Sequence, residues 1–270
     1  MTEPDWLAAC RSARDDVAGV LERLPTRGDR EPVLGKGVGG DETTAVDQAA
    51  EEAILGHFRD LDATIVSEEV GELDPADGSR GRYRVVIDPI DGSLNAKRGI
   101  PFFSLSVAVA DGATMGDVFF GYVHDFGTGE EWTATRGGGA FLNGAALGSE
   151  RPKDSLEILS FEATLTSTIA EKAPAVVGLA RRLRVMGSLA LSLCHLAAGR
   201  VDGVCSLKNA RSVDIAAAQL LVREVGLAID LPAAPPFEAA PLDLEGRSRV
   251  VAAGTEELCR QLAEALAASA

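Results

Sequence analysis

The sequence predicts an α+β protein with an antiparallel sheet in its N-terminal part and an α/β unit in its C-terminal part. Between residues 101 and 141, short alternating apolar segments are separated by turn residues such as Asp111-Gly112, a pattern typical of antiparallel strands. From residue 156 onward, strand-like apolar runs alternate with helical patterns, which indicates an α/β unit. The composition changes near 148–154, so we expect two subdomains, 1–150 and 151–270, with a site between them.

The composition is that of a globular protein and excludes several classes of partner. At 270 residues and 46% hydrophobic content, the chain can bury a substantial core. The net charge of −15 argues against nucleic acid or a membrane surface as partner, because both bind basic faces. No apolar run approaches the ~20 residues of a membrane span, and the start lacks a signal-peptide pattern. The four cysteines have no C-x-x-C spacing, so we expect reduced thiols in a soluble, cytoplasmic protein.

Two amphipathic helices are expected near the N-terminus, separated by a loop. Apolar residues recur at three- and four-residue spacings over 5–24 and again over about 43–59. The intervening segment 25–40 is rich in Gly, Pro and charge, so we expect a mobile loop that carries Lys36. The other expected elements of this half are strands at 63–66, 83–87, 103–109, 118–124 and 130–135 and a hairpin arm around 140–142.

The second half is expected to alternate strands with helices. Strands are predicted at 156–162, 183–186, 202–207 and 249–253, and helices at 165–181, 188–198, 213–225 and 255–268. The segment 231–246 contains four prolines and little periodicity, which is typical of a surface connection.

The stretch 85–95, Val-Val-Ile-Asp-Pro-Ile-Asp-Gly-Ser-Leu-Asn, combines a buried strand with an acidic turn. The proline after Asp88 restricts that residue to an extended backbone, and Asp91 follows at a turn closed by Gly92. Two carboxylates therefore leave one strand end and can point at a common spot. Ser93 is a good N-cap, which would place the neighbouring amides at a helix N-terminus suited to phosphate. These groups suggest metal-assisted phosphate chemistry, and the alternative is an ordinary Asp/Gly turn.

Four further segments place polar groups at strand ends or helix starts. They are Asp41 to Asp47, Glu68-Glu69, Gly187-Ser188 and Asp214. Taken singly, helix capping explains most of them, and solvated surface explains the paired glutamates. The sequence has no P-loop motif. Any chemistry therefore belongs to carboxylates and a metal ion.

In this order, these segments resemble the inositol monophosphatase family, the Mg²⁺-dependent, lithium-sensitive phosphatases that include fructose-1,6-bisphosphatases. The resemblance extends along nearly the whole chain. Arg211, three residues before Asp214, favours a resemblance to the archaeal-type branch, whose members have both inositol phosphatase and fructose bisphosphatase activity. The resemblance implies a layered α/β/α/β/α sandwich and a homodimer. The motifs that carry it are Asp41…Thr44…Asp47, Glu68-Glu69, Asp88-Pro89-Ile90-Asp91-Gly92-Ser93, Gly99-Ile100-Pro101-Phe102-Phe103, Arg184-Val185-Met186-Gly187-Ser188 and Val213-Asp214-Ile215-Ala216-Ala217.

The resemblance further implies two to three Mg²⁺ ions bound by carboxylates and one carbonyl. Glu68, Asp88 and the carbonyl of Ile90 would hold the first ion. Asp88, Asp91 and Asp214 would hold the second, and a third, weaker ion would sit beside the glutamate. Such oxygen ligands suit Mg²⁺. One ion would lower the pKa of the attacking water, and the other would stabilise the leaving alkoxide.

The other site residues are assigned by the same resemblance. Thr44 and Asp47 would orient and deprotonate the attacking water, and Glu68 and Ser93 also count as catalytic. The amides of Gly92 and Ser93 would bind the phosphate. Lys36 would enter the site together with its loop. Further substrate contacts are expected from Asn95, Gly187, Ser188, Lys208 and Arg211.

The sequence departs from the family pattern at positions that leave the substrate open. Ser93 replaces the commoner Thr and keeps the hydroxyl, whereas Ser212-Val213 stands where many members carry Cys-Trp. Ser192 and Ser206 stand where relatives often have acids, and Leu227 where a second Gly is usual. We expect a Mg²⁺-dependent phosphatase acting on inositol monophosphate, fructose 1,6-bisphosphate or both. The alternatives are a 3′(2′),5′-bisphosphate nucleotidase, a histidinol-phosphate phosphatase, or a regulatory protein that kept the fold without turnover.

Overall fold

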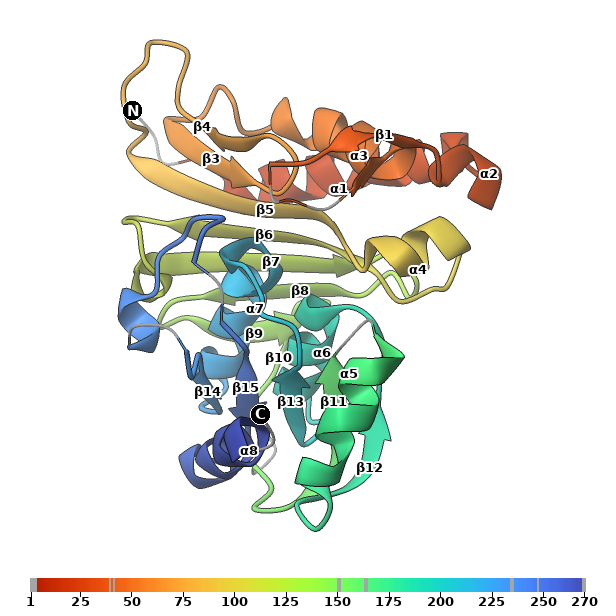
Figure 1. Ribbon diagram of the computed structural model, residues 1–270. Coiled ribbons are helices and arrows are strands. Elements are labelled where there is room, and N and C mark those ends of the chain that lie inside the picture. The colour runs from red at the N-terminus through yellow and green to blue at the C-terminus, as the bar shows by residue number, and fades with distance from the viewer. Residues whose placement is uncertain are drawn as a thin grey trace.

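The computed structural model describes residues 4–38, 40, 42–149, 152–162, 165–233, 236–246 and 248–268. These residues form five layers in the order helix, sheet, helix, sheet, helix, which run from top to bottom in Figure 1. The expected α+β class and the layered sandwich are confirmed. The helices are α1 (Trp6–Arg23), α2 (Arg27–Arg30), α3 (Ala45–Leu55), α4 (Ser93–Arg98), α5 (Thr166–Lys172), α6 (Leu189–Ala197), α7 (Ser212–Glu224) and α8 (Glu256–Ala268), with 3-10 turns η1 (Met115–Asp117), η2 (Ala173–Val176) and η3 (Phe237–Ala239).

Within the described residues, the larger sheet has eight strands in the order β10-β9-β8-β7-β6-β5-β3-β4. The smaller sheet has five, in the order β12-β11-β13-β15-β14, and β1 and β2 form a separate hairpin. The strands are β1 (Val33–Lys36), β2 (Glu42–Thr44), β3 (Ala63–Ser67), β4 (Gly71–Leu73), β5 (Tyr83–Asp91), β6 (Ser104–Ala110), β7 (Val118–Asp125), β8 (Glu131–Thr135), β9 (Gly139–Leu142), β10 (Ala145–Ala146), β11 (Leu156–Glu162), β12 (Ala180–Arg184), β13 (Gly203–Ser206), β14 (Ala228–Asp230) and β15 (Val251–Ala253).

Buried apolar side chains form one cluster beside each layer of helices. The first lies between α1, α3 and the larger sheet, the second surrounds α6 and α7 between the two sheets, and the third lies between α8 and the smaller sheet. Burial of these faces is the main source of stability for such layers. Among the described residues, no helix is both long and apolar enough to cross a membrane.

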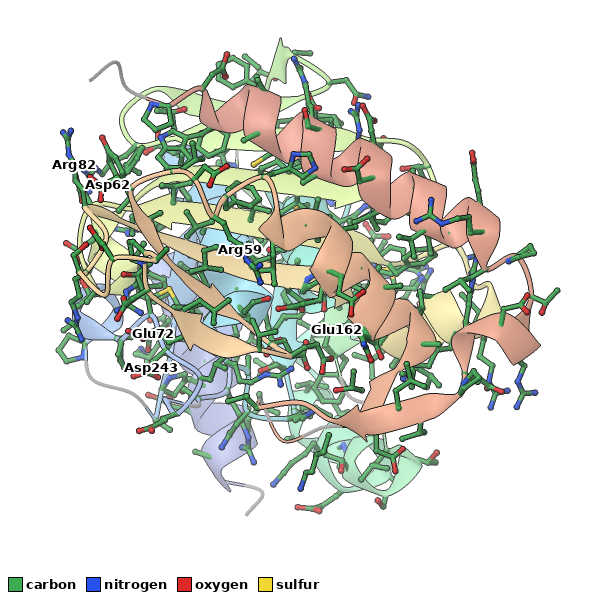
Figure 2. All side chains as sticks on the ribbon, turned by 90° about the horizontal axis from the view of Figure 1, so that it is seen from above. Arg59, Asp62, Glu72, Arg82, Glu162 and Asp243 are labelled. Atoms are coloured by element: carbon green, nitrogen blue, oxygen red, sulfur yellow. The ribbon has the colours of Figure 1, made fainter. Side chains whose placement is uncertain are left out.

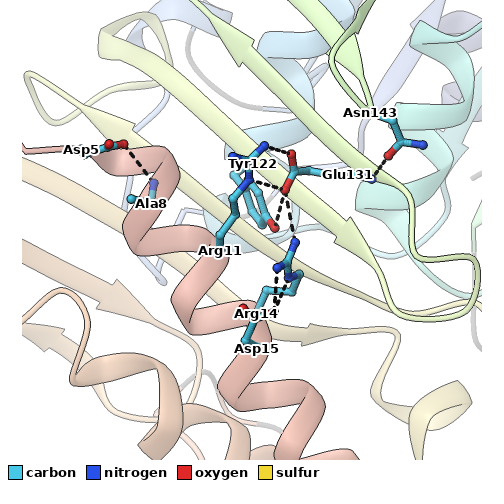
Figure 3. A network of polar contacts seen from close by, with 8 residues as sticks. All are labelled: Asp5, Ala8, Arg11, Arg14, Asp15, Tyr122, Glu131 and Asn143. Atoms are coloured by element: carbon cyan, nitrogen blue, oxygen red, sulfur yellow. Dashed lines mark hydrogen bonds and ion pairs between the residues drawn. The ribbon is translucent and has the colours of Figure 1, made fainter.

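An ion-pair network holds α1 against the larger sheet, as Figure 3 shows. The Glu131 carboxylate on β8 accepts hydrogen bonds from Arg11 Nε at 2.9 Å and from Arg11 Nη2 at 2.7 Å. Arg14 Nη1, one helical turn further along α1, lies 3.4 Å from Glu131 Oε2, and the Tyr122 hydroxyl on β7 donates to that oxygen at 3.3 Å. The network therefore fixes the outer helix across two neighbouring strands.

One parallel pair in an otherwise antiparallel sheet brings two acids together. Strand β3 pairs with β5 in parallel, with Ser67 opposite Ile87. Glu68 follows Ser67, and Asp88 follows Ile87. The pairing therefore places the two acids side by side at the same edge of the sheet. Strand β5 extends beyond the predicted 83–87 and reaches Asp91, with a register irregularity between the two aspartates. The proline between them explains the irregularity, because it has no N–H to donate to the ladder.

Helices α6 and α7 form the middle layer and pack against each other between the sheets. The predicted cap of α6 is confirmed, because Ser188 Oγ accepts a hydrogen bond from Leu191 N at 3.2 Å. Helix α7 begins at Ser212, with Asp214 in its first turn. The starts of both helices line one cavity together with the end of β5.

The predictions for the segments 25–40 and 165–181 are wrong. The sequence predicts a mobile loop over 25–40, but the structure has α2 and β1 there, and β1 pairs with β2. A capping box between Thr26 and Asp29 starts α2 despite the surrounding glycines. The sequence also predicts one helix over 165–181, but α5 ends at Lys172 and β12 begins at Ala180. Pro174 accounts for the early end, because proline cannot continue an α-helix.

Candidate active site

A cavity of about 260 Å³ lies where the end of β5 meets the starts of α6 and α7. Most of the site residues expected from the sequence line it. They are Asp47, Glu68, Asp88, Ile90, Asp91, Gly92, Ser93, Gly187, Lys208, Arg211 and Asp214. Thr44, Asn95 and Ser188 are buried and hydrogen-bond to the lining residues Asp47, Gly92 and Asp91, respectively. Lys36 is exposed on β1 and does not line the cavity. Asp41 lies outside the described residues.

Three carboxylates in this cavity lie close enough together to share a cation. One oxygen from each of Glu68, Asp88 and Asp214 lies within 4.8 Å of the others. Burial raises the pKa of Glu68 to about 7, although Arg211 lowers it. Burial, followed by the Glu68 charge, raises the pKa of Asp88 well above its ordinary value. Crowded carboxylates away from water favour a bound proton or cation, so this group is a candidate metal centre.

Asp91 lies in the same wall, with one oxygen turned toward the start of α6. Its Oδ2 accepts hydrogen bonds from Ser188 Oγ and from Ala190 N, the latter at 2.8 Å. Burial raises the pKa of Asp91 to about 7, and the Ser188 hydrogen bond lowers it. Asp91 thus links the acidic group to α6, and its place in the ligand set remains a prediction.

The Arg211 side chain enters the acidic group. Its Nη2 lies 2.6 Å from Glu68 Oε1 and 3.3 Å from Asp214 Oδ1, and its backbone N donates to Asp214 Oδ2 at 2.6 Å. The side chain is only 7% exposed. The sequence predicts Arg211 as a substrate contact, whereas in the structure its ion pairs are with two of the predicted metal ligands.

The predicted water-orienting pair is held at the start of α3. Asp47 Oδ2 accepts hydrogen bonds from Thr44 N at 3.0 Å and from Thr44 Oγ1 at 2.5 Å, which makes a capping box. Lys97 Nζ lies 3.5 Å from the same oxygen. Asp47 Oδ1 is buried and has no hydrogen-bond partner among the described residues. A buried acceptor without a partner is costly, so this atom is suited to receive a hydrogen bond from a ligand or water.

The turn after β5 requires a glycine for two reasons. Gly92 has a φ of +93°, and a Cβ built on it would lie 3.0 Å from Gly187 O. The sequence predicts Ser93 as the N-cap of the following helix, but Gly92 occupies that position. Ser93 is the first residue of α4, and its hydroxyl donates to Ile90 O at 2.9 Å. The serine hydroxyl therefore stabilises the turn that presents the Ile90 carbonyl.

Asn95 joins segments from the two halves of the chain. Its Nδ2 donates to Phe102 O at 2.8 Å and to Met186 O at 2.7 Å. The predicted substrate contact at this residue would therefore have to share an amide that already binds two carbonyls.

Glu162 is a buried acid in the cavity wall that the sequence prediction does not include. It ends β11 and is 6% exposed, and Figure 2 shows its position beneath α3. Its Oε1 accepts hydrogen bonds from Ser160 Oγ at 2.7 Å and Ser192 Oγ at 2.9 Å, and its Oε2 accepts one from Gly187 N at 2.8 Å. An acid at the exit of a buried strand is the signal that singles out Glu68, and the same signal could have found Glu162.

Comparison with known proteins gives consistent matches. The sequence matches the model of the inositol monophosphatase family over residues 8–270. It is 34% identical to a fructose-1,6-bisphosphatase/inositol-1-monophosphatase of Methanothermobacter thermautotrophicus, over 97% of this chain and 96% of that protein. It is also 34% identical to the Nus factor SuhB of Escherichia coli, over 84% of this chain and 85% of that protein. Among solved structures, the MJ0109 gene product, an inositol monophosphatase-fructose 1,6 bisphosphatase, matches with a TM-score of 0.84 at 26% identity, over 97% of this chain and 100% of that chain.

Proposed function

This chain belongs to the inositol monophosphatase family and is a phosphatase of that family, and we propose that it hydrolyses the phosphate monoester of a small polyol or sugar with Mg²⁺. The proposed substrates are inositol monophosphate, fructose 1,6-bisphosphate or both, because several relatives carry both activities in their names. The observation that carries the proposal is the group of Glu68, Asp88 and Asp214, whose oxygens lie within 4.8 Å of one another.

The residues of the cavity fit a divalent cation. Their donor atoms are carboxylate oxygens, the hard ligands that Mg²⁺ prefers. Burial, followed by the neighbouring Glu68 charge, raises the pKa of Asp88, and a bound cation would favour its charged form. We assign the ions, two or three of them, to Glu68, Asp88, Asp91 and Asp214 with the carbonyl of Ile90. When bound, Mg²⁺ supplies charge stabilisation for the ester oxygens and lowers the pKa of a bound water.

The chain's own groups would position the reactants. We propose that Thr44 and Asp47 hold the attacking water, because Asp47 Oδ1 is a buried acceptor with no partner among the described residues. Gly92 and Ser93 line the cavity, and we assign the binding of phosphate oxygens to their backbone amides. Lys208, on the segment before α7, also lines the cavity and would contact the anionic substrate.

We also propose a homodimer in a reducing compartment such as the cytoplasm. Apolar side chains on the segment that carries α5 and β12 are exposed, with Leu165 at 62%, Val177 at 80% and Val185 at 46%. A second copy of the chain would cover such side chains. All four cysteines are free and buried, which supports a reducing environment. Light scattering at several concentrations tests the dimer, and a purely monomeric protein would contradict it.

The test of function is phosphate release with and without Mg²⁺ from four substrates. They are inositol 1-phosphate, fructose 1,6-bisphosphate, 3′-phosphoadenosine 5′-phosphate and histidinol phosphate. We expect Mg²⁺-dependent turnover of one or both of the first two. Turnover confined to the third or the fourth would favour the nucleotidase or the histidinol phosphatase. Release from none would overturn the proposal and favour a regulatory protein on this fold.

A matched pair of variants connects turnover to the acidic group. We expect Asp91→Asn to abolish turnover with the fold retained, because the amide removes a negative charge from the cavity wall. Asp111→Asn is the control, since Asp111 pairs with Arg136 at the surface and lies outside the cavity. An active Asp91→Asn variant would contradict the metal assignment.

A further inference from the structure

Arg211 places a permanent positive charge inside the candidate metal centre. Its Nη2 contacts Glu68 Oε1 at 2.6 Å and Asp214 Oδ1 at 3.3 Å. These are two of the three carboxylates whose oxygens lie within 4.8 Å of one another. At 7% exposure the guanidinium is shielded from water, so its attraction to both acids is stronger than that of a surface ion pair. In this arrangement Arg211 is the counter-ion of the acidic group.

A divalent cation at this group would compete with the guanidinium for the same two carboxylates. Both are positive, and their repulsion is large where the effective dielectric constant is low. A lysine could relieve the conflict by losing its proton, but an arginine keeps its charge. This repulsion favours movement of the side chain away from the two acids when the cation binds.

We propose that Arg211 is a built-in counter-ion that stabilises the metal-free enzyme and is displaced from Glu68 and Asp214 when Mg²⁺ binds. The inference rests on the proposed function, because it takes those two acids as metal ligands. A Mg²⁺ ion that binds Glu68 or Asp214 then has to replace an ion pair with Arg211 as well as bind its ligands. Arg211 thereby lowers the affinity for Mg²⁺. In the metal-free protein it offsets the repulsion among the three carboxylates, which would otherwise destabilise the fold.

A purely structural role for Arg211 predicts a different outcome. Its backbone N caps α7 through Asp214, and substitution of the side chain leaves that hydrogen bond in place. If the side chain only supported the fold, its loss would lower stability without tightening metal binding. Stability of the metal-free protein and affinity for Mg²⁺ therefore have to be measured together.

The test compares Arg211→Gln and Arg211→Lys with the native protein, using thermal melting in chelator and calorimetric titration with MgCl₂. We expect Arg211→Gln to melt earlier without metal and to bind Mg²⁺ about tenfold more tightly, a change equivalent to about 1.4 kcal/mol. Arg211→Lys should shift both quantities less, because the lysine supplies a positive charge in the metal-free protein and can lose its proton when Mg²⁺ binds. If Arg211→Gln does not fold, the lysine variant alone decides the outcome.

Arg84→Gln is the matched control. Arg84 is similarly enclosed, at 10% exposure, and donates to Glu72 Oε2 at 2.9 Å and to Leu242 O at 3.1 Å. None of these residues lines the cavity, and Figure 2 shows Glu72 well apart from Glu162 in the cavity wall. The control should melt earlier and bind Mg²⁺ like the native protein.

The possible failures can be told apart. A native protein that binds no Mg²⁺ in the titration would overturn the proposed function, and the counter-ion role with it. A native protein that binds Mg²⁺, with Arg211 variants of equal or weaker affinity, would overturn the counter-ion role alone.

Discussion

Replacing Glu162 by alanine should loosen the strand end that supports the cavity. The carboxylate accepts hydrogen bonds from Gly187 N at 2.8 Å and from Met186 N at 3.3 Å. The two serine hydroxyls that it also binds keep partners after the substitution, because Ser160 Oγ and Ser192 Oγ lie 3.1 Å from each other. The main loss therefore falls on the two backbone amides.

The size of the effect follows from those amides. A buried donor left without an acceptor costs about 1–3 kcal/mol. The contact with Met186 is long, and water from the cavity can reach the space vacated by Glu162, so the lower part of the range applies. At about 1 kcal/mol for each of the two amides, we expect the free energy of unfolding to fall by about 2 kcal/mol. Turnover should fall as well, because Gly187 precedes the serine that binds Asp91.

Urea unfolding of the metal-free protein measures the change. Glu157→Ala is the control on the same strand, since Glu157 pairs at the surface with Arg182 at 2.9 Å and with Lys153 at 3.9 Å. Exposed pairs of this kind contribute about 0–1 kcal/mol. Equal unfolding free energies for the Glu162→Ala and Glu157→Ala variants would refute the reasoning about buried amides.

Three further predictions concern residues around the site and the outer helix. The stability of the metal-free protein relative to Asp91→Asn should fall as pH rises from about 4 to about 7, because the folded pKa of Asp91 is raised from 3.8 to about 7. Urea titrations of both proteins across this range check the prediction. A difference in unfolding free energy that grows in favour of the native protein as pH rises would contradict it. Ser188→Ala should lose about 1–2 kcal/mol, because it removes a helix cap and a hydrogen bond to Asp91, and a variant as stable as the native protein in urea would disprove this. Glu131→Gln should lose only about 1 kcal/mol, because Arg11 is 51% exposed, and a much larger loss in the same assay would show that the network is worth more than a surface pair.

Most long elements could be predicted because each has a local signal. Helix α1 shows apolar residues at helical spacing, and β5 is a run of buried β-branched residues. The short edge strands β4 and β14 have three residues each, too few for a period to show. They exist because β3 and β15 offer them hydrogen-bonding partners, which only the folded chain provides.

The same division holds at the site. A shared site could be predicted from acids at strand ends and helix starts in the order of the family, but the parallel pairing of β3 with β5 that places Glu68 beside Asp88 could not. The ion pair between Arg211 and Glu68 could not be predicted, because it depends on where the segment before α7 passes the edge of the larger sheet. The predicted subdomain boundary near residue 150 and the individual roles of the site residues remain predictions.

The assembly of the acidic group from β3, β5 and α7 has a consequence for folding kinetics. Its three carboxylates belong to segments far apart in the chain, so closing the loops between them has to precede tight binding of Mg²⁺. An interaction formed after the rate-limiting step slows unfolding and leaves the refolding rate unchanged. We therefore expect Mg²⁺ to lengthen the lifetime of the native state in stopped-flow experiments, and refolding that accelerates with Mg²⁺ would contradict this order of events. The folded protein should therefore be inactivated irreversibly more slowly as the Mg²⁺ concentration around it rises.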